Sequence, residues 1–339
     1  MSPLEELPLP LLLWFHDNAR DLPWRRDPSP YHVWVSEIML QQTRVGAVMG
    51  YYARFLETLP TVEALACCPQ DTLMKLWQGL GYYSRARNLQ KAARQITEDL
   101  GGVFPREYGQ LRKLAGVGDY TAGAIASIAF GQPVPAVDGN VLRVVSRLND
   151  DHRDVLRPET REDIRRSLTQ VLPVEMPGDF NQAMMDLGAT VCLPNGVPLC
   201  QNCPCRGFCL GFRRDTARDL PVKTPKKARR VEERTVWLIF SGKRVALRRR
   251  PSRGLLAGLW EYPNDLGEPP CPVPGEARFA AAGRHLFTHV EWRMEGFVVE
   301  ARSQALPEGW VWADRTELTE KYPVPSAFSP FTPIVLDRL

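Results

Sequence analysis

Two carboxyl side chains, Glu37 and Asp138, lie in sequence surroundings that predict opposite effects on their ionisation. In a helix, none of the four residues flanking Glu37 at three- and four-residue spacing is basic: Val33, Trp34, Leu40 and Gln41. Apolar surroundings raise a carboxyl pKa and keep the group protonated. Asp138 begins a predicted helix, where backbone N–H groups and the helix dipole favour the ionised form. An acid and an anion of this kind can share one reaction centre; the simpler alternatives are a solvent-facing glutamate and an ordinary helix cap.

Five of the eight cysteines fall between positions 192 and 209. Four of them have the spacing C-x7-C-x2-C-x5-C: Cys192, Cys200, Cys203 and Cys209. Zinc sites usually combine two closely spaced ligand pairs, and only one C-x2-C occurs in this stretch. Four thiolates gathered in one loop favour a 4Fe–4S cluster, with zinc second and free thiols third. The spacing of Cys205 fits less well, so we expect it not to be a ligand.

A glycine turn, Gly116-Val117-Gly118, separates two segments with helical spacing. Such a turn at the start of a helix presents free backbone N–H groups and a positive helix end, which suits a phosphate. Helix ends also use glycine for purely structural reasons, which is the competing interpretation. Basic clusters at 223–230 and 248–253 are compatible with a polyanionic partner and equally with a solvated linker and an exposed turn.

A scaffold for these residues is predicted in two parts. Residues 1–212 are mostly helical, with apolar residues at three- and four-residue spacing in six segments: 62–77, 84–100, 106–114, 119–130, 139–149 and 159–172. Residues 213–231, rich in proline and basic residues, are expected to form a linker. Residues 232–339 form an α+β domain with a terminal helix, 328–339, and five β-favouring runs: 235–240, 244–247, 259–262, 289–292 and 297–300.

The composition is that of a folded protein without a membrane segment. The chain has 339 residues, 44% of them hydrophobic, and a net charge of +4. No apolar run reaches the roughly 18 residues that a spanning helix needs. The leucine-rich start has no preceding basic region, which argues against a secretory signal. We therefore expect a cytoplasmic protein with no membrane partner.

Several motifs together resemble the MutY family of adenine DNA glycosylases, in the endonuclease III-like superfamily. The motifs are LPWR at 22–25, SEIMLQQTR at 36–44, GLGYYSR at 79–85, VGDYTAG at 117–123, VDGNVLR at 137–143 and NQAMMDLG at 181–188. The resemblance implies a helix-hairpin-helix glycosylase fold with a 4Fe–4S cluster loop, followed by a NUDIX-like domain. It implies a monomeric, monofunctional enzyme that hydrolyses the N-glycosidic bond of adenine mispaired with 8-oxoguanine or guanine. Because the bond is inaccessible inside a stacked duplex, the base must be flipped out of double-stranded DNA.

The same resemblance implies roles for individual residues. Glu37 would protonate adenine N7, Asp138 would stabilise the oxocarbenium-like sugar, and Tyr120 would lie beside that sugar. Residues matching positions of the adenine pocket are Trp24, Arg25 and Gln182. Residues matching positions near 8-oxoguanine are Gln42, Tyr82, Phe287, Thr288 and His289. The turn at Gly116, Val117 and Gly118 would contact DNA, and the four spaced cysteines would hold the cluster.

The sequence departs from the family pattern at two places and leaves three other functions to weigh. The first cysteine gap is seven residues instead of six, and Thr288 replaces a common serine. A bifunctional glycosylase/lyase would need an amine nucleophile, yet Tyr120 stands where the superfamily's lyases have lysine, with Lys113 on the preceding segment. A non-catalytic DNA-binding protein would not need the two carboxyl groups. A NUDIX hydrolase would need an acidic box after residues 258–263, and the sequence there lacks one.

Overall fold

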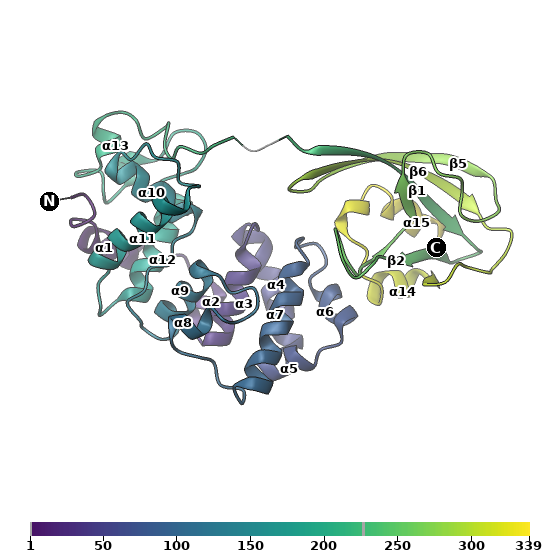
Figure 1. Cartoon of the computed structure of the whole chain (residues 1–339), viewed down its shortest axis with the longest axis horizontal. Helices are drawn as coiled ribbons and strands as arrows, with labels where there is room; N and C mark the ends of the chain where they lie inside the picture. The colour runs from purple at the N-terminus through teal and green to yellow at the C-terminus, as the bar shows by residue number, and fades with distance from the viewer. Residues whose placement is uncertain (1, 226–227) are drawn as a thin grey trace. The chain divides into compact units, whose positions relative to one another are not determined.

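The computed structural model of the chain describes residues 2–225 and 228–339, which form two compact units (Figure 1). The helical unit contains residues 2–66 and 88–225. The sheet unit contains residues 228–339 together with an earlier segment, 67–87. Lys226 and Lys227, in the predicted basic linker, lie outside the described residues.

The helical unit is built around α12, which packs against α1, α9 and α10, while α3 packs against α4 and α9. Its core is made of aliphatic and aromatic side chains on those faces, including Leu7, Leu11, Val144, Phe180 and Leu187. The helices are α1 (Pro8–Asn18), α2 (Pro23–Arg26), α3 (Pro30–Leu40), α4 (Val45–Thr58), α5 (Val62–Cys67), α7 (Ser84–Arg94), α8 (Tyr108–Leu111), α9 (Asp119–Ile128), α10 (Gly139–Asn149), α11 (Pro158–Val171), α12 (Pro177–Thr190) and α13 (Leu210–Arg213). This confirms the predicted helical character. Helix α5 ends, and helix α7 begins, within the segment 67–87.

Three of the predicted helices differ from those in the structure. The segment 62–77 is two helices, α5 and α6 (Gln70–Leu76), because Pro69 lacks an N–H and disfavours a helical residue before it. The segment 84–100 continues beyond Arg94 as a π-helical turn, Gln95–Asp99. The segment 106–114 is helical only over α8, and its last residues form turns before Gly116.

The sheet unit contains one mixed sheet with strand order β3-β2-β1-β6-β5, to which β4 adds beside β1 and β7 beside β2. β1 and β6 are parallel, and the other pairs are antiparallel. The elements are β1 (Arg230–Phe240), β2 (Val245–Arg249), β3 (Trp260–Glu261), β4 (Asn264–Leu266), β5 (Ala277–Leu286), β6 (Val290–Glu300), β7 (Trp310–Ala313), α14 (Arg315–Glu320) and α15 (Thr332–Arg338). The predicted α+β class is confirmed.

The second half of β1, residues 236–240, is a continuous apolar run, and the structure explains why. Val236, Leu238 and Phe240 enter the larger core, which also contains Phe328 and Phe331. The side chains between them, including Trp237 and Ile239, enter a second core on the opposite side of the sheet. A strand buried on both faces needs no polar alternation.

The predicted strands are correct in type but incomplete. The runs 289–292 and 297–300 belong to one strand, β6, whose exposed Arg293 and Glu295 interrupt the apolar pattern on its outer side. β5 was not predicted, because its alanine, glycine and arginine residues give little apolar contrast. The terminal helix begins only at Thr332, with Pro333 in its first turn.

The segment 67–87 is attached to the rest of the sheet unit by side chains that donate to backbone carbonyls. Lys75 Nζ donates to the oxygens of Leu318, at 3.2 Å, and Tyr322, at 3.4 Å. Gln78 Nε2 donates to Val324 O at 2.7 Å. Helix α6 and the loop that follows it are therefore bound to α14 and the residues just after it, which come more than 240 positions later in the chain.

The helices of the described ranges include none that is both long and apolar enough to cross a membrane.

Candidate active site

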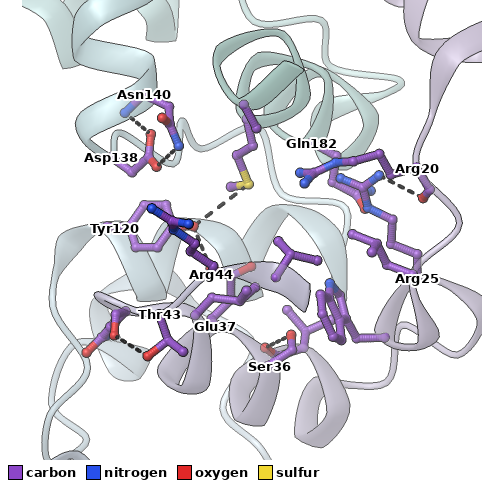
Figure 2. Close-up of a pocket in the computed structure, with 18 of the residues that line it drawn as sticks. Arg20, Arg25, Ser36, Glu37, Thr43, Arg44, Tyr120, Asp138, Asn140 and Gln182 are labelled. Carbon is purple, nitrogen blue, oxygen red and sulfur yellow. Dashed lines mark hydrogen bonds between the residues drawn. The ribbon is translucent and has the colours of Figure 1, made fainter. Parts of the chain in front are cut away.

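A cavity of about 560 Å³ opens in the helical unit where α3, α9, α12 and the start of α10 meet (Figure 2). Seven residues predicted for catalysis or base binding line it: Trp24, Arg25, Glu37, Gln42, Tyr120, Asp138 and Gln182. They come from positions 24 to 182, so the fold gathers residues that the sequence keeps far apart. The structure thus brings the two carboxyl groups into one cavity.

Glu37 occupies the buried side of α3 and is 5% exposed. The hydroxyl of Tyr120 on α9 donates to Glu37 Oε2 at 2.5 Å. Burial raises the pKa of Glu37 to about 7, with Asp138 adding to the rise and Tyr120 and Arg25 opposing it. The predicted upward shift is confirmed, and it leaves a carboxylic acid able to give up a proton near neutral pH.

Tyr120 is a hydrogen-bond donor in this site. Burial and the neighbouring carboxyl groups hold its pKa well above 10, so the phenol keeps its proton. Its position against Glu37 orients the carboxyl oxygen that it contacts. In Figure 2 the Tyr120 ring lies between Glu37 and Asp138.

Asp138 is the N-cap of α10, as the sequence predicts. Its Oδ1 accepts from the backbone N–H groups of Asn140 and Val141, both at 2.8 Å, and its Oδ2 accepts from Asn140 Nδ2 at 2.9 Å. The predicted net effect on ionisation is wrong: burial raises the Asp138 pKa, and these hydrogen bonds only limit the rise. Burial therefore shifts both carboxyl groups upward. Asp138 accepts three hydrogen bonds that stabilise its anion, whereas Glu37 accepts one, from Tyr120.

A hydrogen-bonded chain leads from Asp138 to the cysteine loop. Arg143 Nη2 donates to Asn140 Oδ1 at 2.9 Å and to Gly188 O at 2.7 Å, while its Nε donates to Cys192 O at 2.9 Å. Arg143 is 4% exposed, so this chain is internal to the unit. Asn140 and Arg143 were missed as functional residues, although both lie inside the quoted motif at 137–143.

The opposite wall of the cavity is basic and aromatic. Figure 2 shows Arg20, Arg25 and Gln182 grouped on one side, with Asp138 and Asn140 on the other. Trp24 is 6% exposed and contacts Tyr52 edge to face, with ring centroids 5.3 Å apart. Arg20 was not predicted as a site residue, because nothing in its local sequence distinguishes it.

The loop after α3 completes the rim. Gln42 lines the cavity and has φ +61°, a left-handed conformation that costs a residue with a side chain some strain. Such strain is common where a loop presents groups to a ligand. Gln41, left without a role in the sequence, donates to Thr121 Oγ1 at 3.3 Å and so ties this loop to α9.

The predicted hairpin lies outside the cavity, at the start of α9. Gly116 has φ +75°, and a Cβ there would lie 2.7 Å from Asn88 Cβ, so glycine is required on both counts. Val117 is buried, and Gly118 is an N-cap whose helix receives no side-chain cap. The first N–H groups of α9 are therefore not capped by a side chain, as an anion site requires.

The spaced cysteines line one small pocket of about 30 Å³ in the helical unit, together with Cys205. No carboxylate or imidazole lines that pocket, so its donor set has the soft character that suits iron–sulfur clusters or zinc. Arg147 Nη1 donates to Cys192 Sγ at 3.2 Å. Among residues 2–225 and 228–339, no three potential ligands are already arranged to hold a metal ion. The residues fit such a group in chemistry and location.

The sheet unit carries the predicted 8-oxoguanine loop between β5 and β6. Phe287 packs between the rings of His285 and Trp292, at centroid distances of 4.5 and 4.9 Å, while Thr288 and His289 are exposed. The hydroxyl oxygen of Tyr82, in the segment 67–87, lies 3.3 Å from Thr288 Oγ1. Two residues that the family resemblance places near 8-oxoguanine, 206 positions apart, are thus in direct contact.

Residues 267–276, where a NUDIX hydrolase motif would continue, form no helix. The buried carboxylate nearby, Glu261, is bound by Arg248 at 2.9 Å and by Arg250 at 2.5 Å. These two arginines neutralise the negative charge of Glu261, so little charge remains to attract a magnesium ion.

Comparisons with protein families match both parts of the chain. Residues 35–173 match the model of the HhH-GPD superfamily base excision DNA repair proteins, and residues 235–332 match that of the NUDIX domain. The chain is 35% identical to human adenine DNA glycosylase over 91% of this chain and 70% of that protein. It is 39% identical to the mouse enzyme of the same name, over 76% of this chain and 60% of that one.

Solved structures match the helical part. A thermostable thymine-DNA glycosylase gives a TM-score of 0.56 at 28% identity, over 62% of this chain and 97% of that one. Endonuclease III in a non-covalent DNA complex gives 0.53 at 26% identity, over 62% of this chain and 94% of that one.

Proposed function

The chain belongs to the family of adenine DNA glycosylases, and we propose that it removes adenine mispaired with 8-oxoguanine or guanine from double-stranded DNA. The single observation that supports this most directly is the pair Glu37 and Asp138 in one cavity, each with a different set of donors. The proposal includes a monomeric, cytoplasmic enzyme that flips the base and makes no strand cut.

In the proposed reaction, the Glu37 carboxylic acid gives its proton to N7 of the flipped adenine. The bond between N9 and C1′ then breaks, and adenine leaves as a neutral base. Asp138 stabilises the positive charge that develops on the sugar, directly or through a covalent adduct. Water adds to C1′ and returns a proton to Glu37, which restores the enzyme.

Selection of the opposite base is assigned to the loop at Phe287, Thr288 and His289 with Tyr82, and Gln42 is assigned to the same lesion from the helical unit. Support comes from the contact between the Tyr82 hydroxyl, in the segment 67–87, and the exposed Thr288 of the loop, whose neighbour Phe287 packs against Trp292. The hairpin turn Gly116-Val117-Gly118 is assigned to a DNA phosphate, since such contacts fix register without reading sequence. The donors would be the N–H groups of Gly116 and Gly118, because Val117 N already donates to Leu114 O at 3.1 Å.

The function is tested by single-turnover reactions with duplexes carrying A·8-oxoG, A·G, A·C or thymine glycol. We expect adenine release in the first two and none of the borohydride trapping that an amine nucleophile would produce. Release from thymine glycol, or strong lysine-dependent trapping, would replace this proposal with the glycosylase/lyase alternative.

A hydroxyl-selective substitution tests the recognition loop. Thr288→Val keeps the shape of the side chain and removes its hydroxyl, so the ratio of A·8-oxoG to A·G rates should fall by about three- to tenfold, as for one lost hydrogen bond. Thr288→Ser is the matched control and should keep the ratio. Truncation at residue 232 is a poorer test, because it also strips the segment 67–87 of its partners.

We propose that Cys192, Cys200, Cys203 and Cys209 hold a 4Fe–4S cluster, which in this setting would order the loop that Arg143 and Arg147 contact. Purified protein should contain about four iron atoms per chain and little zinc. Cys205→Ser should leave the iron content unchanged, whereas Cys200→Ser should lower it. A zinc content near one per chain without iron would contradict the cluster.

A further inference from the structure

A fully buried carboxylate, Asp186 on α12, lies behind the basic wall of the active-site cavity. Its side chain is 0% exposed and binds two arginines. Oδ1 accepts from Arg20 Nε at 2.8 Å, Arg20 Nη2 at 2.5 Å and Arg25 Nη2 at 2.8 Å. Oδ2 accepts from Arg25 Nη1 at 2.8 Å and from the backbone N–H of Arg20 at 3.2 Å. One anion thus holds two cations from the segment before α3.

The two arginines are fixed from further directions as well. Arg25 Nη1 donates to Arg20 O at 3.1 Å, and the Arg25 guanidinium lies over the Phe15 ring, 5.4 Å from its centroid. Both arginines line the cavity. A buried ion pair alone adds little net stability, so stability is a weak reason for such an arrangement. A rigid pair of donors at a binding site is a stronger one.

We propose that Asp186 is the positioning residue of the base pocket, holding Arg20 and Arg25 so that their remaining N–H groups face the ring nitrogens of the flipped adenine. This inference depends on the proposed function. Guanidinium groups donate hydrogen bonds and cannot accept them. Adenine N1 accepts, whereas guanine carries a hydrogen there, so two fixed donors discriminate in favour of adenine.

Asp186 also balances charge near the general acid. The groups facing Glu37 are Tyr120 from α9, Asp138 at the start of α10 and Arg25 from α2, and Arg20 and Arg44 line the same cavity. Without the Asp186 charge, Arg20 and Arg25 would form an uncompensated cationic pair. That pair would favour the ionised form of Glu37 and so lower the Glu37 pKa.

The test is adenine release from an A·8-oxoG duplex by Asp186→Asn, in single turnover from about pH 5 to about pH 9. We expect the variant's rate, relative to the wild type, to be reduced at least about tenfold more at the alkaline end than at the acid end. A fall of one unit in the Glu37 pKa would produce this difference. Asp163→Asn is the matched control, since Asp163 also binds two arginines, Arg153 and Arg166, but at the surface. The control should keep the wild-type rate and pH profile.

No loss at any pH would overturn the positioning role of Asp186. A loss that is equal at every pH would overturn its charge balance with Glu37. If Asp186→Asn does not fold, the double variant Arg20→Met/Asp186→Asn removes one charge of each sign. It should show the wild-type pH profile with a lower plateau; a profile still shifted toward acid would contradict the charge balance. If the wild-type enzyme releases no adenine, the proposed function fails. If the wild-type enzyme releases adenine and Asp186→Asn has the same pH profile, only this inference fails.

Discussion

Glu37→Gln is expected to lose adenine release by about 10²- to 10⁴-fold, the usual contribution of a general acid. Glutamine has the same shape and can still accept the hydrogen bond from Tyr120, so the change removes only the proton that the base must receive. Single-turnover rates on an A·8-oxoG duplex measure the loss. Binding to the same duplex should persist, because Glu37 is buried inside the cavity and is not assigned to a contact with a DNA phosphate.

The pH dependence of the wild-type enzyme tests the same assignment. Glu37 must be protonated to act, and burial raises its pKa to about 7. The rate should therefore be highest below about pH 7 and fall about tenfold per unit above it. This fall should disappear in Glu37→Gln.

Glu57→Gln serves as the control for Glu37→Gln, because it makes the same chemical change at an exposed position on α4. Its rate and pH profile should match those of the wild type. A Glu37→Gln variant with more than about a tenth of wild-type activity would assign the proton to another group.

Asp138→Asn should be the second most damaging substitution, with a loss of about 10²- to 10³-fold in single-turnover rate. Asparagine keeps an oxygen that can accept the N–H groups of Asn140 and Val141, so α10 should begin where it does now. What disappears is the negative charge that faces the sugar cation. Melting temperature and DNA affinity should change little.

Asp314→Asn is the matched control, because Asp314 is also an N-cap carboxylate, accepting from Glu317 N at 2.8 Å, but on α14 of the sheet unit. It should leave the rate intact. If Asp138→Asn retained full activity, the carboxylate would be only a helix cap, which was the simpler interpretation of its sequence position.

Local sequence predicted the features of this site that depend on local structure. The apolar neighbours of Glu37 predicted its raised pKa, and the position of Asp138 before a helical run predicted its N-cap role. The net ionisation of Asp138 was predicted wrongly, because burial depends on segments that cover it from elsewhere in the chain. A sequence shows which donors lie near a carboxyl group, and the fold decides how much water reaches it.

Long-range partners escaped sequence reasoning for the same reason. Asp186 meets Arg20 across 166 positions. Asp186 lies inside the quoted motif at 181–188, but nothing in either segment indicates that the two residues pair. The contact of Tyr82 with Thr288 was equally unpredictable as a contact, although each residue was selected separately through the family resemblance. Secondary structure failed where apolar contrast is weak, as in β5, or where a proline divides a periodic run, as at Pro69.

The composition of the sheet unit bears on how mutations should be grouped. Because residues 67–87 belong to that unit, the unit is discontinuous in the sequence: one segment lies within the helical half of the chain, and the rest follows it. Substitutions at Lys75 or Gln78 should therefore resemble those in the final third of the chain in their phenotype, altering the choice of opposite base more than the cleavage step. Fragments 1–225 and 228–339, co-expressed as separate polypeptides, should accordingly reassociate through this shared piece.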